Sequence, residues 1–121
     1  MTAIGATASD AETIAKLRAL PEIKFSTESS AAYHVEKHID DLPPSEANLT
    51  TPATRVQSYL ESAAKTVKTG TAVTGANQDG TPTVAFTRTV TENHKAYTLT
   101  ARVFLTEDGN AFLATYGGGS Q

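Results

Sequence analysis

The chain has no cysteine among its 121 residues. This absence excludes disulfide bonds, thiol nucleophiles and zinc sites built on cysteine. No apolar run approaches the roughly 20 residues that a membrane-spanning helix needs. Residues 1–8 are neither basic nor apolar enough for a signal peptide, so export of this domain would depend on sequence outside these residues.

Positive charge is also scarce. Lysine and arginine total 10 against 13 aspartates and glutamates, which gives a formal net charge of -3. A protein that coats nucleic acid through bulk charge is normally basic, so the composition argues against such a coat but still allows a local cationic site. The length and the hydrophobic content of 39% fit one domain with one core.

Helices are expected in the first half of the chain. The S-x-x-E pattern at Ser9 resembles a capping box, and apolar residues follow at helical spacing until Pro21 ends the helix. Ser29 or Ser30 is expected to cap a second helix that reaches about Ile39.

The best-marked helix is expected over residues 52–69. Thr51 suits the N-cap position, Pro52 suits the first helical turn, and Gly70 suits the C-cap. The preceding segment, residues 40–51, is rich in proline and polar residues and is expected to be a loop.

The apolar period changes from 3.6 to 2 after residue 70, which predicts strands. The expected strands are 71–74, 84–90, 97–105 and 111–116, with turns at 77–80, 92–95 and 107–110. Gly109 is free to take a positive φ in the last turn, and Gly117–Gly119 is expected to be a flexible end.

The predicted fold class is α+β, with N-terminal helices packed on one face of a C-terminal antiparallel β-meander of about four strands. Residues 1–25 are interpreted as a lead-in with a short helix. Residues 26–121 are interpreted as a single globular domain.

The segment that stands out chemically is His34-Val-Glu-Lys-His38, which holds two of the three histidines. In a helix, residues four apart lie on one face, so the two imidazoles would be neighbours. A zinc site is disfavoured, because the metalloprotease pattern is H-E-x-x-H and the third histidine, His94, lies in a turn. Two interpretations remain at this point, an active site or a chance pairing of surface histidines.

Metal-free cleavage of RNA suits the residues better than other reactions. The substrate supplies the 2′-hydroxyl nucleophile, and the enzyme needs a base, an acid and groups that stabilise the charge on phosphorus. Histidine titrates near neutral pH and suits the first two roles. Residues that could converge for this chemistry are His34, Lys37, His38, Arg88, Arg102, Thr115 and Tyr116. A serine hydrolase is disfavoured, because no G-x-S-x-G motif is present.

Two motifs together resemble a known family. The first is the helix pattern H-x-E-K-H-[IV], and the second is the terminal hairpin R-V-F-L-T-E-D-G-N-A-F-L-A-T-Y-G. They resemble the bacterial RNase A-like toxin domains at the C-termini of contact-dependent growth inhibition proteins and other polymorphic toxins, in the barnase–EndoU–colicin–RelE group. The resemblance covers residues 31–118.

The resemblance implies a metal-independent endoribonuclease that uses no cofactor and takes RNA, with tRNA as one candidate substrate. It also implies a monomer that is delivered as part of a larger exported protein, acts in the target-cell cytoplasm during interbacterial competition, and is blocked by a cognate immunity protein.

The family's site residues can be matched to positions of this chain. The resemblance implies that His38 is the general base or acid, and that His34 orients His38 or binds phosphate. Thr115 matches a phosphate contact, and Tyr116 matches an acid or a group that stabilises the transition state.

This chain departs from the family pattern at two places. Relatives usually have T-x-Y followed by proline, whereas Thr115 and Tyr116 are adjacent here and glycine follows. Adjacent strand residues face opposite ways, so only one of the two can point into a site unless the strand bulges or ends there. Relatives also place an arginine soon after the histidine helix, whereas residues 40–51 contain none. Arg88 is the expected substitute, with Lys37 as a further substrate-binding cation.

A non-enzymatic binding module, such as an immunity or adaptor protein, is the alternative. The acidic balance and the short loops favour it. In such a module, the histidines would lie apart from Thr115, Tyr116 and Arg88.

Overall fold

The computed structural model describes residues 6–118 and has an α+β fold. The elements are α1 (Ala6–Ala19), α2 (Glu28–His38), the 3-10 helix η1 (Ile39–Asp41), α3 (Pro52–Thr69), β1 (Thr71–Ala76), β2 (Pro82–Glu92), β3 (Lys95–Leu105) and β4 (Ala111–Gly118). The expected order of helices followed by four antiparallel strands is confirmed. Within the described residues, no helix is both long and apolar enough to span a membrane.

The starts of the first two helices differ from expectation. α1 begins at Ala6, so Ser9 lies within the helix and is not its cap. α2 is capped by Thr27, whose side chain accepts a hydrogen bond from the Ser30 backbone N–H at 3.0 Å. Placing the cap at Ser29 or Ser30 was wrong because Thr27, in an extended conformation, already satisfies this free N–H group.

α3 begins and ends as predicted. Thr51 caps it and Pro52 occupies its first turn. Gly70 is the C-cap, in an extended conformation with φ -77°. Glycine is needed there because a Cβ atom would lie 2.6 Å from the carbonyl oxygen of Thr66 and 2.9 Å from that of Thr87. The end of α3 is therefore held directly against β2.

The sheet is a meander in the order β1-β2-β3-β4. The turn between β2 and β3 places Asn93 and His94 at positive φ (53° and 67°). Gly109 has φ 88° in the turn between β3 and β4, as predicted. These turns join neighbouring strands directly, so the sheet needs no crossover connection.

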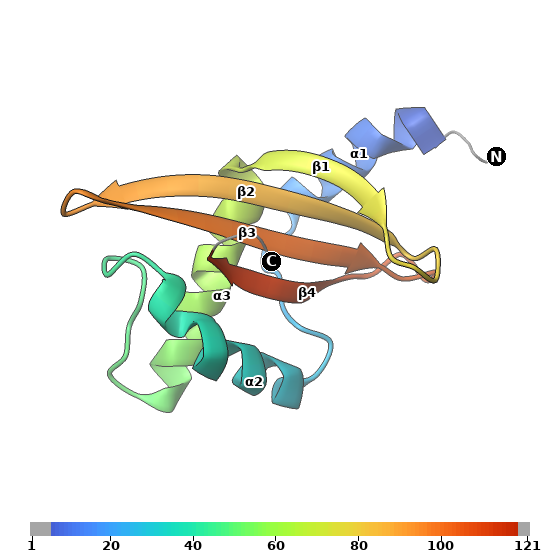
Figure 1. The fold of residues 1–121 in the computed structure, drawn as a ribbon. Helices are drawn as coiled ribbons and strands as arrows, with labels where there is room; N and C mark the ends of the chain where they lie inside the picture. Colours follow the sequence, from blue (N-terminus) through green and yellow to red (C-terminus); the bar gives the residue numbers. More distant parts are fainter. Residues whose placement is uncertain (1–5, 119–121) are drawn as a thin grey trace.

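α3 covers one face of the sheet, and Figure 1 shows it crossing behind the strands. We call this the inner face. Its buried apolar side chains on the strands are Val84, Phe86, Leu99, Ala101, Val103, Leu113 and Tyr116, and α3 contributes Tyr59, Ala63 and Val67. Full burial of a large apolar side chain stabilises a fold by about 1.5–3 kcal/mol. The opposite, outer face carries threonine pairs such as Thr87–Thr100, whose hydroxyls lie 3.2 Å apart.

A β-bulge in β4 decides which side chains reach the inner face. Val103 pairs with Leu113, but Arg102 pairs with Thr115, so Ala114 is an extra residue without a partner on β3. Leu113 and Tyr116 therefore both point to the inner face although they are three residues apart.

β4 then continues to Gly118, so placing Gly117 in a flexible end was wrong. Both glycines are held by backbone pairing with β3, opposite Thr100 and Leu99. The remaining residue of that predicted end, Gly119, lies outside the described part of the chain.

The segment before residue 26 contributes to the same core. Leu17, Ile23 and Phe25 are buried. Phe25 forms a parallel bridge with Leu113, whose N–H donates to the carbonyl of Lys24 at 2.8 Å. The division of the chain at residue 25 stays a prediction, and the packing across it is continuous.

A polar network ties the loop after η1 to the inner face. Arg88 forms a two-point ion pair with Glu46, with both N–O distances at 2.7 Å and side-chain exposures of 10% and 13%. The Arg88 Nε also donates to the Thr66 hydroxyl at 3.0 Å. Hydrogen bonding from Arg88 lowers the pKa of Glu46. The pair therefore fastens the loop to β2 and α3.

Replacing Arg88 with methionine should destabilise the fold by about 3 kcal/mol, because it leaves the Glu46 carboxylate shielded and unpaired. Arg55→Met, at an exposed position of α3, is the control and should cost less than about 0.5 kcal/mol. Urea unfolding at pH 7 measures both. Because the folded pKa of Glu46 is lowered, the stabilisation is present above its ordinary pKa and is lost as pH falls through the folded value. Equal losses in the two variants would contradict this role.

Candidate functional site

The two histidines of α2 are neighbours on one helical face, as predicted. Their rings are nearly parallel, with centroids 6.1 Å apart. The ring of His34 also stacks on Phe25 with centroids 4.7 Å apart. The Nδ1 atom of His34 is buried and has no hydrogen-bond partner among the described residues. The ring of His34 thus lies between Phe25 of the lead-in segment and the ring of His38 at the end of α2.

His38 is oriented by Asp41. The His38 Nδ1 and the Asp41 Oδ2 are 2.8 Å apart, and the side chains are 12% and 36% exposed. η1 produces this contact because a 3-10 helix has about three residues per turn, which brings side chains at i and i+3 onto the same side. The same Oδ2 accepts a hydrogen bond from the Gly118 N–H at 3.0 Å. Asp41 therefore links the imidazole to the end of β4.

The ring of His38 occupies space that a side chain on Gly117 would need. A Cβ atom on Gly117 would lie 2.7 Å from the His38 Nδ1 and 2.9 Å from the Asp41 Oδ2. Side chains alternate along a strand, so this position faces the same side as Thr115 and the opposite side from Tyr116. The His38 ring therefore packs at the free edge of β4, against the side of Gly117 from which the Thr115 side chain also projects.

Thr115 lies opposite Arg102 in the ladder between β3 and β4. Its hydroxyl oxygen is buried and has no hydrogen-bond partner among the described residues. Buried polar atoms are nearly always hydrogen-bonded, so the unpaired Thr115 hydroxyl and His34 Nδ1 are unusual. The structure thus places His38 beside Gly117, with the Thr115 side chain on the same side of β4 two residues earlier.

Tyr116 and Arg88 lie on the inner face, and their polar groups bond to α3 and Glu46. Tyr116 is fully buried, and its hydroxyl contacts Ser62, Thr66 and Arg88. Burial raises the pKa of Tyr116, and hydrogen bonding to Glu46 raises the pKa of Arg88. Both side chains are engaged by internal partners in this structure. Their predicted catalytic and substrate-binding roles stay predictions.

Lys37 and His94 are both exposed. The Lys37 Nζ lies 3.4 Å from the Tyr33 hydroxyl and 5.6 Å from the centre of its ring, a loose contact at the surface. Lys37 is therefore a solvent-facing cation one residue before His38. His94 lies in the turn between β2 and β3, beyond the end of β4.

Sequence reasoning missed Asp41. Residues 40–51 were predicted only to form a loop that ends the helix. The sequence does contain one signal, the i,i+3 spacing of Asp41 from His38. This spacing brings the carboxylate beside the imidazole if the helix continues for one more turn. The hydrogen bond to Gly118 had no signal in the sequence, because it joins residues 77 positions apart.

The surroundings of His34 favour its neutral form. Burial, followed by the nearby His38 and Lys37, lowers its pKa from the ordinary value of 6.5. The neutral form of His34 is therefore favoured more strongly than in a free imidazole. A neutral imidazole can accept a proton, which is a requirement of a general base.

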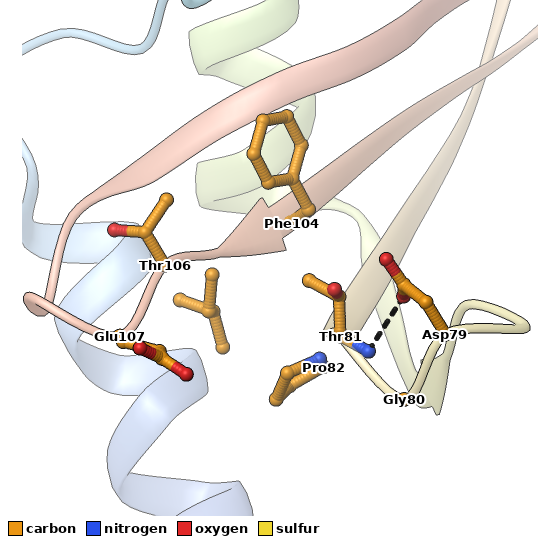
Figure 2. A pocket seen from close by; sticks show the side chains of 8 residues that line it. Asp79, Gly80, Thr81, Pro82, Phe104, Thr106 and Glu107 are labelled. Atoms are coloured by element: carbon orange, nitrogen blue, oxygen red, sulfur yellow. Dashed lines mark hydrogen bonds between the residues drawn. The ribbon is translucent and has the colours of Figure 1, made fainter.

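A cavity of about 540 Å³ lies away from the histidines, between the β1–β2 and β3–β4 turns. Figure 2 shows Asp79, Pro82, Phe104 and Glu107 around it. Gly117, beside His38, pairs with Thr100 in the middle of β3, whereas the cavity is lined by Phe104 and Leu105 at the end of that strand. Among the residues described, no group of three or more histidine, aspartate or glutamate side chains could hold a metal ion.

Comparisons of the chain with protein-family models, with curated proteins and with solved structures found no match.

We predict that His34 titrates below pH 6.5, and that His38→Ala raises its pKa by removing a neighbouring positive charge. NMR titration of the histidine ring signals measures both values. Between the folded pKa and 6.5 the unfolded chain binds more protons, so the contribution of His34 to stability is lost as pH falls through that range. A His34 pKa above 6.5, or one unchanged in the variant, would contradict this electrostatic picture.

Proposed function

We propose that this protein is a metal-independent endoribonuclease toxin domain that cleaves RNA by attack of the 2′-hydroxyl. The main support is the His38–Asp41 pair at the end of β4, beside His34 and on the same side of the strand as Thr115. The motif resemblance to RNase A-like toxin domains is independent support, since it rests on residue patterns and not on geometry.

In the proposed reaction, the 2′-oxygen forms a bond to the adjacent phosphorus and the bond from phosphorus to the 5′-oxygen breaks. A base removes the proton from the 2′-hydroxyl, and an acid gives a proton to the departing 5′-oxygen. The products are a 2′,3′-cyclic phosphate and a free 5′-hydroxyl. No metal-bound water is required, because the substrate supplies its own nucleophile.

His38 is the proposed base or acid, acting through Nε2 because Nδ1 is engaged by Asp41. His34 is the neutral second imidazole. The Thr115 hydroxyl, which has no partner in the described structure, is the proposed hydrogen-bond donor to the phosphate. Lys37 supplies a positive charge from the exposed side of α2.

In this proposal Tyr116 and Arg88 support the site from the inner face. Tyr59 donates a hydrogen bond to the Tyr116 carbonyl, and the Tyr116 hydroxyl joins the Arg88–Glu46 network. These contacts fix the backbone of β4 immediately before Gly117. Tyr116, which matches the family pattern, and Arg88, the expected substitute for its arginine, thus act in this proposal through the position of the strand.

The biological setting follows from the resemblance. The domain would be delivered into a competing cell as part of a larger exported protein and would act on cytoplasmic RNA, with tRNA as a candidate. A cognate immunity protein would protect the producing cell.

A non-enzymatic binding module is the second candidate. It is favoured by the net charge of -3 and by the internal partners that engage Arg88 and Tyr116. In that case His38 and Asp41 would only fasten the end of α2 to β4.

Incubating the protein with total tRNA and with a single-stranded RNA in EDTA distinguishes the two candidates. We predict cleavage that leaves 2′,3′-cyclic phosphate ends, and a rate at least about 100-fold lower for His38→Ala. His94→Asn is the matched control, because it removes an exposed histidine and asparagine tolerates the positive φ found there. This control should cleave at the parent rate.

Intact RNA after incubation with the folded parent protein would reject the ribonuclease and favour the binding module. Cleavage that persists unchanged in His38→Ala would reject the proposed site. Loss of cleavage on adding EDTA would reject the metal-independent reaction.

A further inference from the structure

One carboxylate oxygen forms hydrogen bonds with two elements that are far apart in the sequence, α2 and β4. The Oδ2 of Asp41 lies 2.8 Å from the His38 Nδ1 and accepts the Gly118 N–H at 3.0 Å. An oxygen held by a backbone N–H of a paired strand has a fixed position. The imidazole that bonds to it is therefore aligned with the end of β4 as well as with its own helix.

Gly117 completes the arrangement by having no side chain. Its missing Cβ would lie within 2.9 Å of three atoms, the Nδ1 and Cγ of His38 and the Oδ2 of Asp41. Contacts below 3.0 Å are not tolerated at a real Cβ, so any other residue would displace the ring or the carboxylate. The glycine is thus matched to the position of the imidazole.

We propose that Asp41 is a positioning residue that holds the proton of His38 on Nδ1 and leaves Nε2 facing the substrate. The absence of a side chain at Gly117 provides the space that this orientation requires. This inference deepens the proposed ribonuclease function and rests on it for the substrate. The orientation of the ring rests only on the contacts above.

The chemical reason lies in the two forms of a neutral imidazole. One ring nitrogen carries a hydrogen and the other accepts. An ionised carboxylate can only accept, so a partner at Nδ1 selects the form with hydrogen on Nδ1. Nε2 is then the proton acceptor in every molecule, whereas an unrestrained ring divides its population between the two forms.

Two-bond ¹H–¹⁵N NMR spectra of the histidine rings test the assignment without any RNA. In the parent protein, the neutral ring of His38 should show hydrogen on Nδ1. Asp41→Ala should shift the population toward hydrogen on Nε2. Asp40→Ala removes the neighbouring, exposed carboxylate and should leave His38 unchanged. Hydrogen on Nε2 in the parent, or an unchanged form in Asp41→Ala, would overturn the proposal.

Gly117→Ala is a second test that leaves Asp41 in place. It should displace the ring signals of His38, while Gly75→Ala should not. Gly75 is the matched control because it also lies in a strand, and its added Cβ would meet nothing closer than the Thr83 hydroxyl at 3.5 Å. Unchanged His38 signals in a folded Gly117→Ala protein would overturn the proposal.

Kinetics then connect the orientation to the reaction. Asp41→Ala and Gly117→Ala should each lower kcat about tenfold or more while KM stays near the parent value, because proton transfer and not binding is affected. Unchanged kcat in both variants would overturn the positioning role. If the parent protein cleaves no RNA, the proposed function fails, and the NMR result still decides the orientation of His38.

Discussion

Ala114 is an extra residue in β4 that has no pairing partner on β3, and it decides which side chains of β4 face the core. Without the bulge, strict alternation from Leu113 would send Thr115 into the core and Tyr116 to the outer side. With it, a large aromatic residue fills the interior, and the Thr115 hydroxyl and the open space at Gly117, against which His38 packs, lie on the other side of the strand. One unpaired residue thus sets both the packing of α3 and the composition of the candidate site.

The polar residues near β4 form two groups with different patterns of hydrogen bonding. On the inner face, Arg88 and Tyr116 satisfy each other and Glu46, and such a network is stable only when every member is paired. In the second group, His34 and Thr115 each keep a buried polar atom that has no partner among the described residues. Complete pairing suits a structural role, and incomplete pairing is more often found where a ligand or water completes the set.

Patterns within the sequence were sufficient for the α+β class, for α3 and for the alternation of β2 and β3, because capping residues and apolar periods are local signals. The cap of α2 was misplaced because Thr27, Ser29 and Ser30 are all residue types that suit an N-cap, and only the structure shows that the helix already begins after Thr27. The histidine pair followed from i,i+4 spacing. The bulge, the pairing of Gly118 and the contact with Asp41 depend on tertiary packing, for which no local pattern exists. Arg88 was recognised as a strand residue, but its partner Glu46 lies in a loop 42 positions away.

The hydrogen bond between Asp41 and Gly118 also determines at which stage of folding the candidate site can form. The meander forms from neighbouring segments, whereas this contact closes a loop of 77 positions and needs the last described strand in place. A chain still emerging from the ribosome, or threading through a membrane pore, has its helices before it has β4. In such a chain the imidazole is present but has no fixed orientation. If the protein is a ribonuclease, it is therefore inert until it is complete, which would separate its synthesis and transport from its activity.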